Sequence, residues 1–440
     1  MTDYWMKLPF LLMIELMQRE EEGCEVSPFR AEVSALTDAS SPAEMWALYD
    51  RISTLQPIPD FPYDEPSMLD GIRKARPTKH THPTFTLSED TLKDRILGAW
   101  FGRCVGCTLG KPVEGLTRAQ IETYLKAAGA YPLNDYIPLI DTMPEGVELH
   151  PSFVDTVRGK IVYMSRDDDT DYTILGLHIL EKYGPGFTSA DVGETWLNSL
   201  PYNMVFTAER IAYRNLCSDV FPPDSAATHN PFREWIGAQI RADGFAYAAA
   251  GLPEVAAELV FKDAAVSHVK NGIYGEMFIA AVISAAFLTD DLEEMIRIGL
   301  DQIPQHSRFA EMVAKVQQWS KENPNWQTTW DKIANDYGTY FWAHTLNNAA
   351  IVLMALLYGN GDLEKSLSIA VMGGWDTDCN GATVGSIIGA WKGAAALPVS
   401  WTGKMNNLMH SAVNGFDNTL ITDLALRSWR TSQTVREVLG

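Results

Sequence analysis

The chain of 440 residues is long enough for a large core and, by length alone, for two or three domains. Its formal net charge of −21 argues against nucleic acid or an anionic membrane surface as an electrostatic partner. The five cysteines are an odd and sparse set, which predicts a reducing compartment and a cytoplasmic location rather than a disulfide framework.

The first 86 residues are predicted to form an N-terminal helical extension that ends in a linker. The apolar run KLPFLLMIELM at 7–17 is short and is followed by the acidic residues Glu20–Glu22, so it predicts an amphipathic helix rather than a signal peptide. The proline-containing segments at 58–66 and 75–85 indicate connections between elements. The sequence leaves open whether this extension packs beside a functional cleft or forms a dimer surface, and it leaves the oligomeric state open.

Residues 87–440 are predicted to form one all-α domain. Helical periodicity with polar, glycine or proline ends recurs along it, for example at 173–184, 276–288, 291–303 and 347–359. The longest apolar runs are shorter than the roughly 18–20 residues needed to span a bilayer, so no membrane partner is expected.

Two predicted helices carry a glycine at every fourth position. These glycines are Gly98, Gly102, Gly106 and Gly110 in the first segment and Gly381, Gly385, Gly389 and Gly393 in the second. The spacing puts each set on nearly one helix face, where each glycine costs about 1 kcal/mol relative to alanine. Close packing against another helix is the expected compensation. We therefore predict that the two smooth helices pack tightly and that the acidic residues at their ends converge.

Acidic residues stand in three places along this part of the chain: Glu114, the run Asp167–Asp169, and the pair Asp376 and Asp378. Helix capping explains one aspartate, but three adjacent carboxylates repel one another unless cations hold them. Carboxylate oxygens are hard ligands suited to magnesium, manganese or calcium, and two clusters fit a two-metal site. An EF-hand is excluded, because Ile387 stands where its twelfth-position glutamate is required.

For the other polar candidates, a purely structural role is the simpler interpretation. Cys104 and Cys107 lie within the first glycine-spaced helix, which favours buried small residues over a redox or zinc half-motif. A lone histidine such as His268 is more often structural than ligand-binding.

Five collinear segments carry recognisable motifs: GCTLGKPVE at 106–114, DDDT at 167–170, GAQIRADG at 237–244, SH at 267–268 and GGWDTDCNGATVGSIIGA at 373–390. Together they resemble the motifs of the ADP-ribosylglycohydrolase family, which is related to dinitrogenase-reductase-activating glycohydrolase. The resemblance implies an all-α ADP-ribosylglycohydrolase-like helical bundle, with residues 87–440 as the catalytic domain and residues 1–86 as an added N-terminal helical segment.

The resemblance also implies a hydrolase that cleaves the C1 glycosidic bond of an ADP-ribosyl group, with ribose hydroxyls held at one or two magnesium ions. Manganese or calcium could replace magnesium, and the partner would be a small-molecule or ADP-ribosylated substrate. Carried over residue by residue, the implied catalytic residues are Glu114, Asp168 and Asp169, and the implied metal ligands are Asp167, Asp168, Asp169, Asp376 and Asp378. The implied substrate-binding residues are Gly237, Ala238, Arg241, His268, Gly373, Gly374 and Asn380.

The chain departs from the family pattern at several of these positions. Cys107 stands where the family usually has aspartate, and Asp167 replaces the first threonine of Thr-Asp-Asp-Thr. Trp375 is inserted before the late acid pair, and Cys379 replaces a threonine whose hydroxyl would face a metal. A thiol is a poor magnesium ligand, so a second metal is expected to bind weakly.

These departures leave three functions to compare. The first is the ADP-ribosyl hydrolase, and the second is a glycoside hydrolase for another ribofuranoside or a nucleoside-like N-glycoside. The third is a non-catalytic module that binds ADP-ribose. The retained aspartates and Glu114 argue against this third function. The leaving group stays open.

Overall fold

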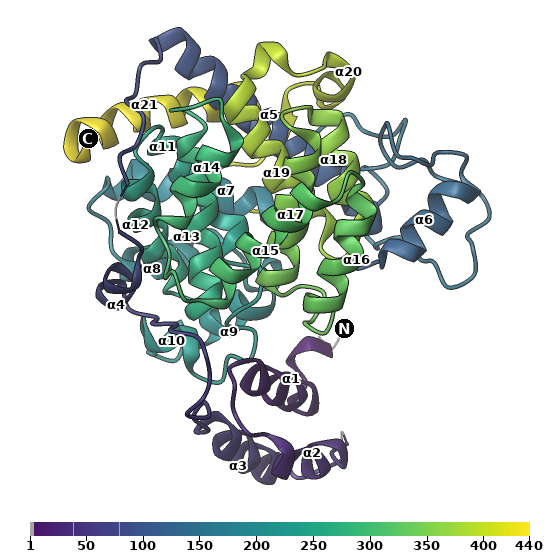
Figure 1. Ribbon diagram of the computed structural model, residues 1–440, viewed down its shortest axis with the longest axis vertical. Helices are drawn as coiled ribbons and strands as arrows, with labels where there is room; N and C mark the ends of the chain where they lie inside the picture. Colours follow the sequence, from purple (N-terminus) through teal and green to yellow (C-terminus); the bar gives the residue numbers. More distant parts are fainter. Residues whose placement is uncertain (1–3, 38, 79) are drawn as a thin grey trace.

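The computed structural model describes residues 4–37, 39–78 and 80–440 (Figure 1). In this part of the chain there are 21 α-helices, and the named strands are two short ones, β1 (Leu408–Met409) and β2 (Thr419–Leu420), which pair antiparallel. The predicted all-α fold is therefore confirmed. Among the described residues, no helix is both long enough and apolar enough to cross a membrane.

The two glycine-spaced segments form α5 (Glu89–Gly110) and α19 (Thr377–Lys392), which pack antiparallel against each other. The facing pairs are Gly98 with Gly389, Gly102 with Gly385, and Gly106 with Gly381. A Cβ atom added to any of these glycines would overlap the backbone of the opposite helix. The predicted close packing is confirmed, except that Gly393 lies just beyond the end of α19 and Gly110 faces Thr377. The antiparallel register puts the end of α5 beside the start of α19.

Helices that surround this pair bury most of their residues. They include α7 (Asp168–Tyr183), α11 (Ala242–Ala248), α13 (Lys270–Ala285), α17 (Thr345–Gly359) and α18 (Leu363–Met372). In α13 and α17 nearly every residue is buried, which explains why their apolar residues are not confined to one face. The acidic ends of α7 and α19 are therefore held by helices with little freedom to shift.

The remaining helices after residue 87 cover this core. They are α6 (Arg118–Ala127), α8 (Ser189–Ser199), α9 (Thr207–Leu216), α10 (Asp224–Ala227), α12 (Pro253–Ala264), α14 (Leu292–Leu300), α15 (Arg308–Glu322), α16 (Trp326–Tyr337), α20 (Val399–Thr402) and α21 (Ile421–Leu439). Helix α6 and the non-helical chain that follows it project from the body at the right of Figure 1.

The N-terminal extension contains α1 (Leu8–Glu21), α2 (Ser27–Ser34), α3 (Pro42–Ser53) and α4 (Leu69–Ala75). Helices α1 to α3 lie together at the bottom of Figure 1. Their apolar side chains form one cluster with residues of the body, namely Ala208, Ile211, Phe232, Trp235 and Ala343. The extension therefore shares a hydrophobic core with the body.

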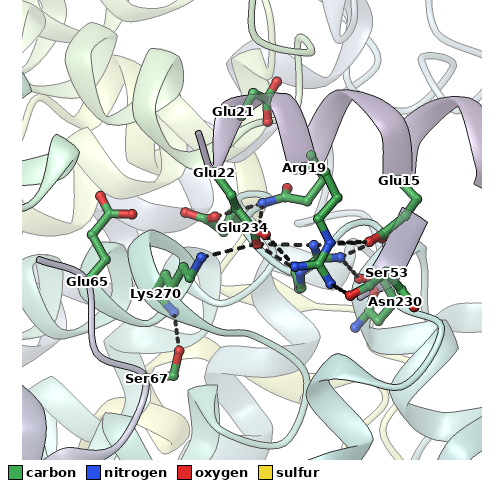
Figure 2. Close-up of polar contacts among 12 residues, drawn as sticks. Glu15, Arg19, Glu21, Glu22, Ser53, Glu65, Ser67, Asn230, Glu234 and Lys270 are labelled. Atoms are coloured by element: carbon green, nitrogen blue, oxygen red, sulfur yellow. Dashed lines mark hydrogen bonds and ion pairs between the residues drawn. The ribbon is translucent and has the colours of Figure 1, made fainter. Parts of the chain in front are cut away.

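Buried charged residues also join α1 to the body. Arg233 of the body contacts Glu15 at 2.6 Å and Glu22 at 3.1 Å, both from the extension. Gln18 donates a hydrogen bond to Glu234 at 2.7 Å. Figure 2 shows the carboxylates of Glu15, in α1, and of Glu22, which directly follows α1, pointing into this network. Because such groups are costly to bury unpaired, the network fixes the position of α1 on the body.

Candidate active site

One pocket of about 350 Å³ collects acidic side chains from segments far apart in the chain. It lies where the end of α5 meets the beginnings of α7 and α19. The carboxylates that line it are Glu114, Asp167, Asp168, Asp169, Glu209, Asp376 and Asp378. All the residues that the sequence suggested as catalytic or metal-binding thus face the same space.

The first acid segment begins α7. Asp167 is the N-cap, and its Oδ1 atom accepts a hydrogen bond from the backbone N–H of Asp169 at 3.1 Å. The carboxylate of Asp169 lies between Arg103, whose Nη2 atom is 3.4 Å from Oδ1, and Cys379, whose thiol donates to Oδ2 at 3.2 Å. Asp167 therefore caps α7 while it also lines the pocket, as the sequence allowed. Protein groups already contact two of the three carboxylates, those of Asp167 and Asp169.

The late acid segment begins α19 after a sharp turn. Gly374 and Trp375 have φ angles of +81° and +67°, and a Cβ atom on Gly374 would collide with neighbouring backbone. The backbone N–H of Asp376 donates to Oδ1 of Asn348 at 3.2 Å. Asp376 and Asp378 are only 5% and 2% exposed, yet among the described residues their Oδ1 atoms have no hydrogen-bond partner. Unpaired buried oxygens of this kind are costly unless a proton or a cation meets them.

Lys111 stands at the centre of the carboxylates. It lies in the short 3-10 helix η2 (Lys111–Val113), which follows α5 directly. Its Nζ atom is 2.7 Å from Asp167, 2.8 Å from Asp378 and 2.8 Å from Glu114. Burial lowers the pKa of Lys111, but these three carboxylates raise it well above the ordinary lysine value. The ammonium group is therefore a permanent positive charge inside the acidic pocket.

The pocket shifts the pKa values of its carboxylates in opposite directions. Burial, and then the charge of Asp167, raises the pKa of Asp168 to about 7. Burial and the neighbouring Asp378 raise the pKa of Glu114 and the pKa of Asp376 well above their ordinary values. Burial also acts to raise the pKa of Asp378, but the adjacent ammonium group overcomes it and lowers that pKa to about 2. Near neutral pH the pocket thus offers both a fixed anion and exchangeable protons.

Two groups of ligand atoms are compact enough to surround a cation. Within each group the atoms lie within 4.8 Å of one another, and the groups are Cys107, Asp167, Asp169 and Asp378, and Asp376, Asp378 and Cys379. The second group fits a cation, because Asp376 and Asp378 each keep one oxygen without a hydrogen-bond partner in the described part of the chain. In the first group, Asp167 and Asp169 already accept contacts from protein donors. Mixed carboxylate and thiol ligands are compatible with several divalent metals.

The suggested substrate-binding loop contributes backbone to the pocket, while its arginine lies behind the wall. Gly237 lines the pocket and Ala238 is fully buried. The guanidinium of Arg241 pairs with Asp263 and with Glu209 (2.5 Å), and it donates to the carbonyl oxygen of Gly237 at 3.0 Å. Arg241 therefore holds the wall in place and is not among the residues that line the pocket.

Four other suggested substrate-binding residues also lie outside the pocket lining: His268, Gly373, Gly374 and Asn380. His268 is 1% exposed, and its Nδ1 atom lies 2.8 Å from the hydroxyl of Ser267. Asn380 donates to the same Asn348 oxygen that binds the backbone of Asp376, at 2.9 Å. Asn380 therefore shares a partner with the turn that carries Asp376, whereas His268 lies buried beside Ser267.

Sequence reasoning missed the residues that give the pocket its positive charge and its aromatic wall. The sequence did contain a clue to Lys111, because this residue stands inside the motif GKPVE at 110–114. Trp5, Trp235 and Trp342 also line the pocket, and the Trp5 ring packs edge-on at centroid distances of 6.1 Å and 6.4 Å from the other two. No pattern in the sequence links Trp5 to this site, because the extension reaches it only through the tertiary fold.

Comparisons with known proteins agree with this arrangement. Residues 88–437 match the sequence model of the family described as ADP-ribosylglycohydrolase. A solved structure named as an ADP-ribosylglycohydrolase-related protein complex has a TM-score of 0.51 at 18% identity, covering 78% of this chain and 99% of that chain, which shows a likeness of fold. No curated protein matches the sequence. The family match covers most of the chain, so this protein belongs to the ADP-ribosylglycohydrolase family of glycosidases.

Proposed function

We propose that this chain is a metal-dependent hydrolase that cleaves the C1 glycosidic bond of an ADP-ribosyl group attached to a protein, a nucleic acid or a small molecule. The observation that supports this most directly is the shared pocket in which Glu114 meets the carboxylates of both acid segments. Family membership supports this class of bond, and the low pKa of Asp378 and the raised pKa of Asp168 supply groups suited to its hydrolysis.

Glycosidic bond cleavage passes through an oxocarbenium-like state that carries positive charge on the sugar. The ionised carboxylate of Asp378 would stabilise that charge, since it stays negative throughout the neutral range. Asp168, with a pKa of about 7, is suited to exchange a proton with water, and burial raises the pKa of Glu114, which suits it to give a proton to the departing group. A divalent cation bound by Asp376 and Asp378 would align ribose hydroxyls and strengthen their acidity.

The aromatic wall favours a second candidate, a nucleoside-like N-glycoside. Trp5, Trp235 and Trp342 present indole surfaces to the same pocket as the carboxylates. A planar base or a planar leaving group would pack well on such a surface, whereas a plain sugar conjugate would gain less.

Turnover of defined substrates tests the proposal. ADP-ribosyl-arginine, an ADP-ribosyl-serine peptide, a purine nucleoside and a simple riboside would be incubated with the protein, with and without magnesium, and released ADP-ribose or ribose would be measured. The proposal expects release from an ADP-ribosyl substrate only with a divalent ion. Release from the nucleoside alone would favour the second candidate. Binding of ADP-ribose without any turnover would identify a binding module and contradict the proposal.

A pair of matched variants connects turnover to this pocket. Glu114→Gln keeps the side chain's shape and removes its proton-transfer capacity, so we expect kcat to fall by about 10²–10⁴. Glu148→Gln is the control, because Glu148 is exposed and is not among the pocket-lining residues. Equal activity in both variants would place the catalytic centre elsewhere.

A further inference from the structure

We infer that Lys111 is a built-in cation that takes the place of one metal ion, so that this chain binds a single divalent ion at its late acid segment. The inference rests on the proposed function only for the presence of a metal in this pocket. It concerns the number of ions and the residue that limits this number, and its test reads metal binding rather than turnover.

The contacts of Lys111 are those that a bridging cation would make. Its three carboxylate partners come from three separate parts of the chain: Glu114 beyond α5, Asp167 at the start of α7 and Asp378 in α19. The ammonium group forms ion pairs with all three carboxylates at 2.7–2.8 Å, and it donates a hydrogen bond to Oδ2 of Asp378. The positive charge that holds these segments together is therefore supplied by the protein.

In the first acid segment, all four carboxylate oxygens of Asp167 and Asp169 already contact protein groups. Of the two Asp167 oxygens, one faces Lys111 and the other accepts the backbone N–H of Asp169. The two Asp169 oxygens face Arg103 and the thiol of Cys379. A divalent ion at this position would have to displace the ammonium group, since it would need the Asp167 and Asp378 oxygens that the ammonium group contacts.

The late acid segment differs, because one oxygen of each of its two aspartates has no hydrogen-bond partner among the described residues. Oδ1 of Asp376 and Oδ1 of Asp378 have no partner among the described residues, and both side chains are more than nine-tenths buried. These two residues and Cys379 also place one ligand atom each within 4.8 Å of one another. One ion can bind here while Lys111 keeps its contact with the other oxygen of Asp378.

The backbone fixes Lys111 in this position. It directly follows Gly110, the last residue of α5, whose missing side chain lets the helix end touch the backbone of Thr377 on α19. The ammonium group is buried, and it cannot swing into solvent without losing its contacts with two buried carboxylates, Asp167 and Asp378, and with the partly buried Glu114. Its charge is therefore a permanent feature of the site.

Counting manganese ions tests this inference. Mn²⁺ chloride would be titrated into metal-free full-length protein, with bound ions counted by calorimetry and by electron paramagnetic resonance. Wild type should bind one ion. Lys111→Met, which keeps most of the side-chain volume without the charge, should bind two ions with a spin-coupled signal. Lys111→Arg should remain at one, and Lys160→Met is the exposed-lysine control, also expected at one.

The outcomes separate cleanly. Two ions or no ion in wild type would overturn the inference, as would one ion in a folded Lys111→Met protein. If Lys111→Met does not fold, the count in wild type and in Lys111→Arg decides: one ion in each supports the inference, and any other count contradicts it. Since none of these readouts needs a substrate, failure to cleave ADP-ribosyl compounds would reject the proposed function without affecting the ion count.

Discussion

At the scale of single residues, protein side chains supply part of the positive charge that compensates the three adjacent aspartates at 167–169. Asp167, Asp168 and Asp169 should repel one another, and the sequence predicts that cations must hold them. Two of these cations are protein side chains, since Lys111 contacts Asp167 and Arg103 contacts Asp169. The local pattern therefore indicates correctly that positive charge is needed, but the tertiary structure decides where it comes from.

Glu21, at the end of α1, provides a prediction about pH. Burial raises its pKa from 4.5 to about 8, against the opposing effect of Arg308. The folded chain thus holds this proton more tightly than the unfolded chain. The contribution of Glu21 to the free energy of unfolding should therefore fall by a few kcal/mol as pH rises from about 4.5 to about 8.

Glu21→Gln should remove this loss, so the variant should gain stability over wild type as pH rises through that window. Urea unfolding at several pH values between about 5 and 9 would measure it. The exposed Glu20→Gln is the control. Parallel pH profiles for wild type and Glu21→Gln would show that the carboxylate titrates normally.

At the scale of elements, the pair α5 and α19 positions the site. Glycines on each helix touch the backbone of the other, so the ends that carry Lys111 and Asp378 cannot move apart independently. Backbone contacts leave no flexible side chain that could shift to make room. The packing surface therefore tolerates no added atom, which is a sharper constraint than an ordinary core position imposes.

Gly102→Ala tests this constraint. The new Cβ atom would overlap the carbonyl oxygen of Gly385, so we expect a loss of about 3 kcal/mol or more in the free energy of unfolding, at the upper end of overpacking costs. Gly186→Ala is the matched control, because its Cβ atom would meet nothing within 4 Å. Chemical denaturation would measure the free energy of unfolding of both variants and of wild type. A Gly102→Ala protein as stable as the control would mean that the two helices can separate at little cost.

The extension acts on the pocket through Trp5. Its indole lines the pocket beside Trp235 and Trp342, although it belongs to a segment outside the family match. Trp5→Ala should raise KM for a substrate with a planar group by about 2–10-fold, corresponding to roughly 0.5–1.5 kcal/mol of aromatic contact, with little change in kcat. Trp429→Ala, which is not in the pocket lining, is the control. An unchanged KM in Trp5→Ala would mean that substrate does not reach this ring.

At the scale of the whole molecule, the extension and the body share buried charges as well as a hydrophobic cluster. Arg233 faces Glu15 and Glu22, and Arg308 pairs with Glu65 at 2.7 Å as well as with Glu234 of the body at 2.9 Å. Removing one partner of a buried pair is costly, because it leaves the other charge without compensation.

A chain reduced to residues 87–440 keeps every family motif but loses these partners. We expect it to aggregate or to melt far below the full-length protein, since Arg233 would be unpaired and Phe232 and Trp235 would be uncovered. Gel filtration and thermal melting of both chains measure this. A monomeric fragment with the melting temperature of the full chain would show that the two parts fold independently.

The sequence by itself determined the helical class, the glycine contact between α5 and α19, and the family, because these depend on local periodicity and on collinear motifs. It also singled out the acids that meet in the pocket, apart from Glu209. Only the tertiary structure decided that Lys111 points into the carboxylates, that Arg241 turns to Asp263 and Glu209 behind the wall, and that Trp5 reaches the pocket. The reason is physical: where a long or aromatic side chain points depends on the charges and surfaces that distant segments bring to it, and no local pattern encodes these.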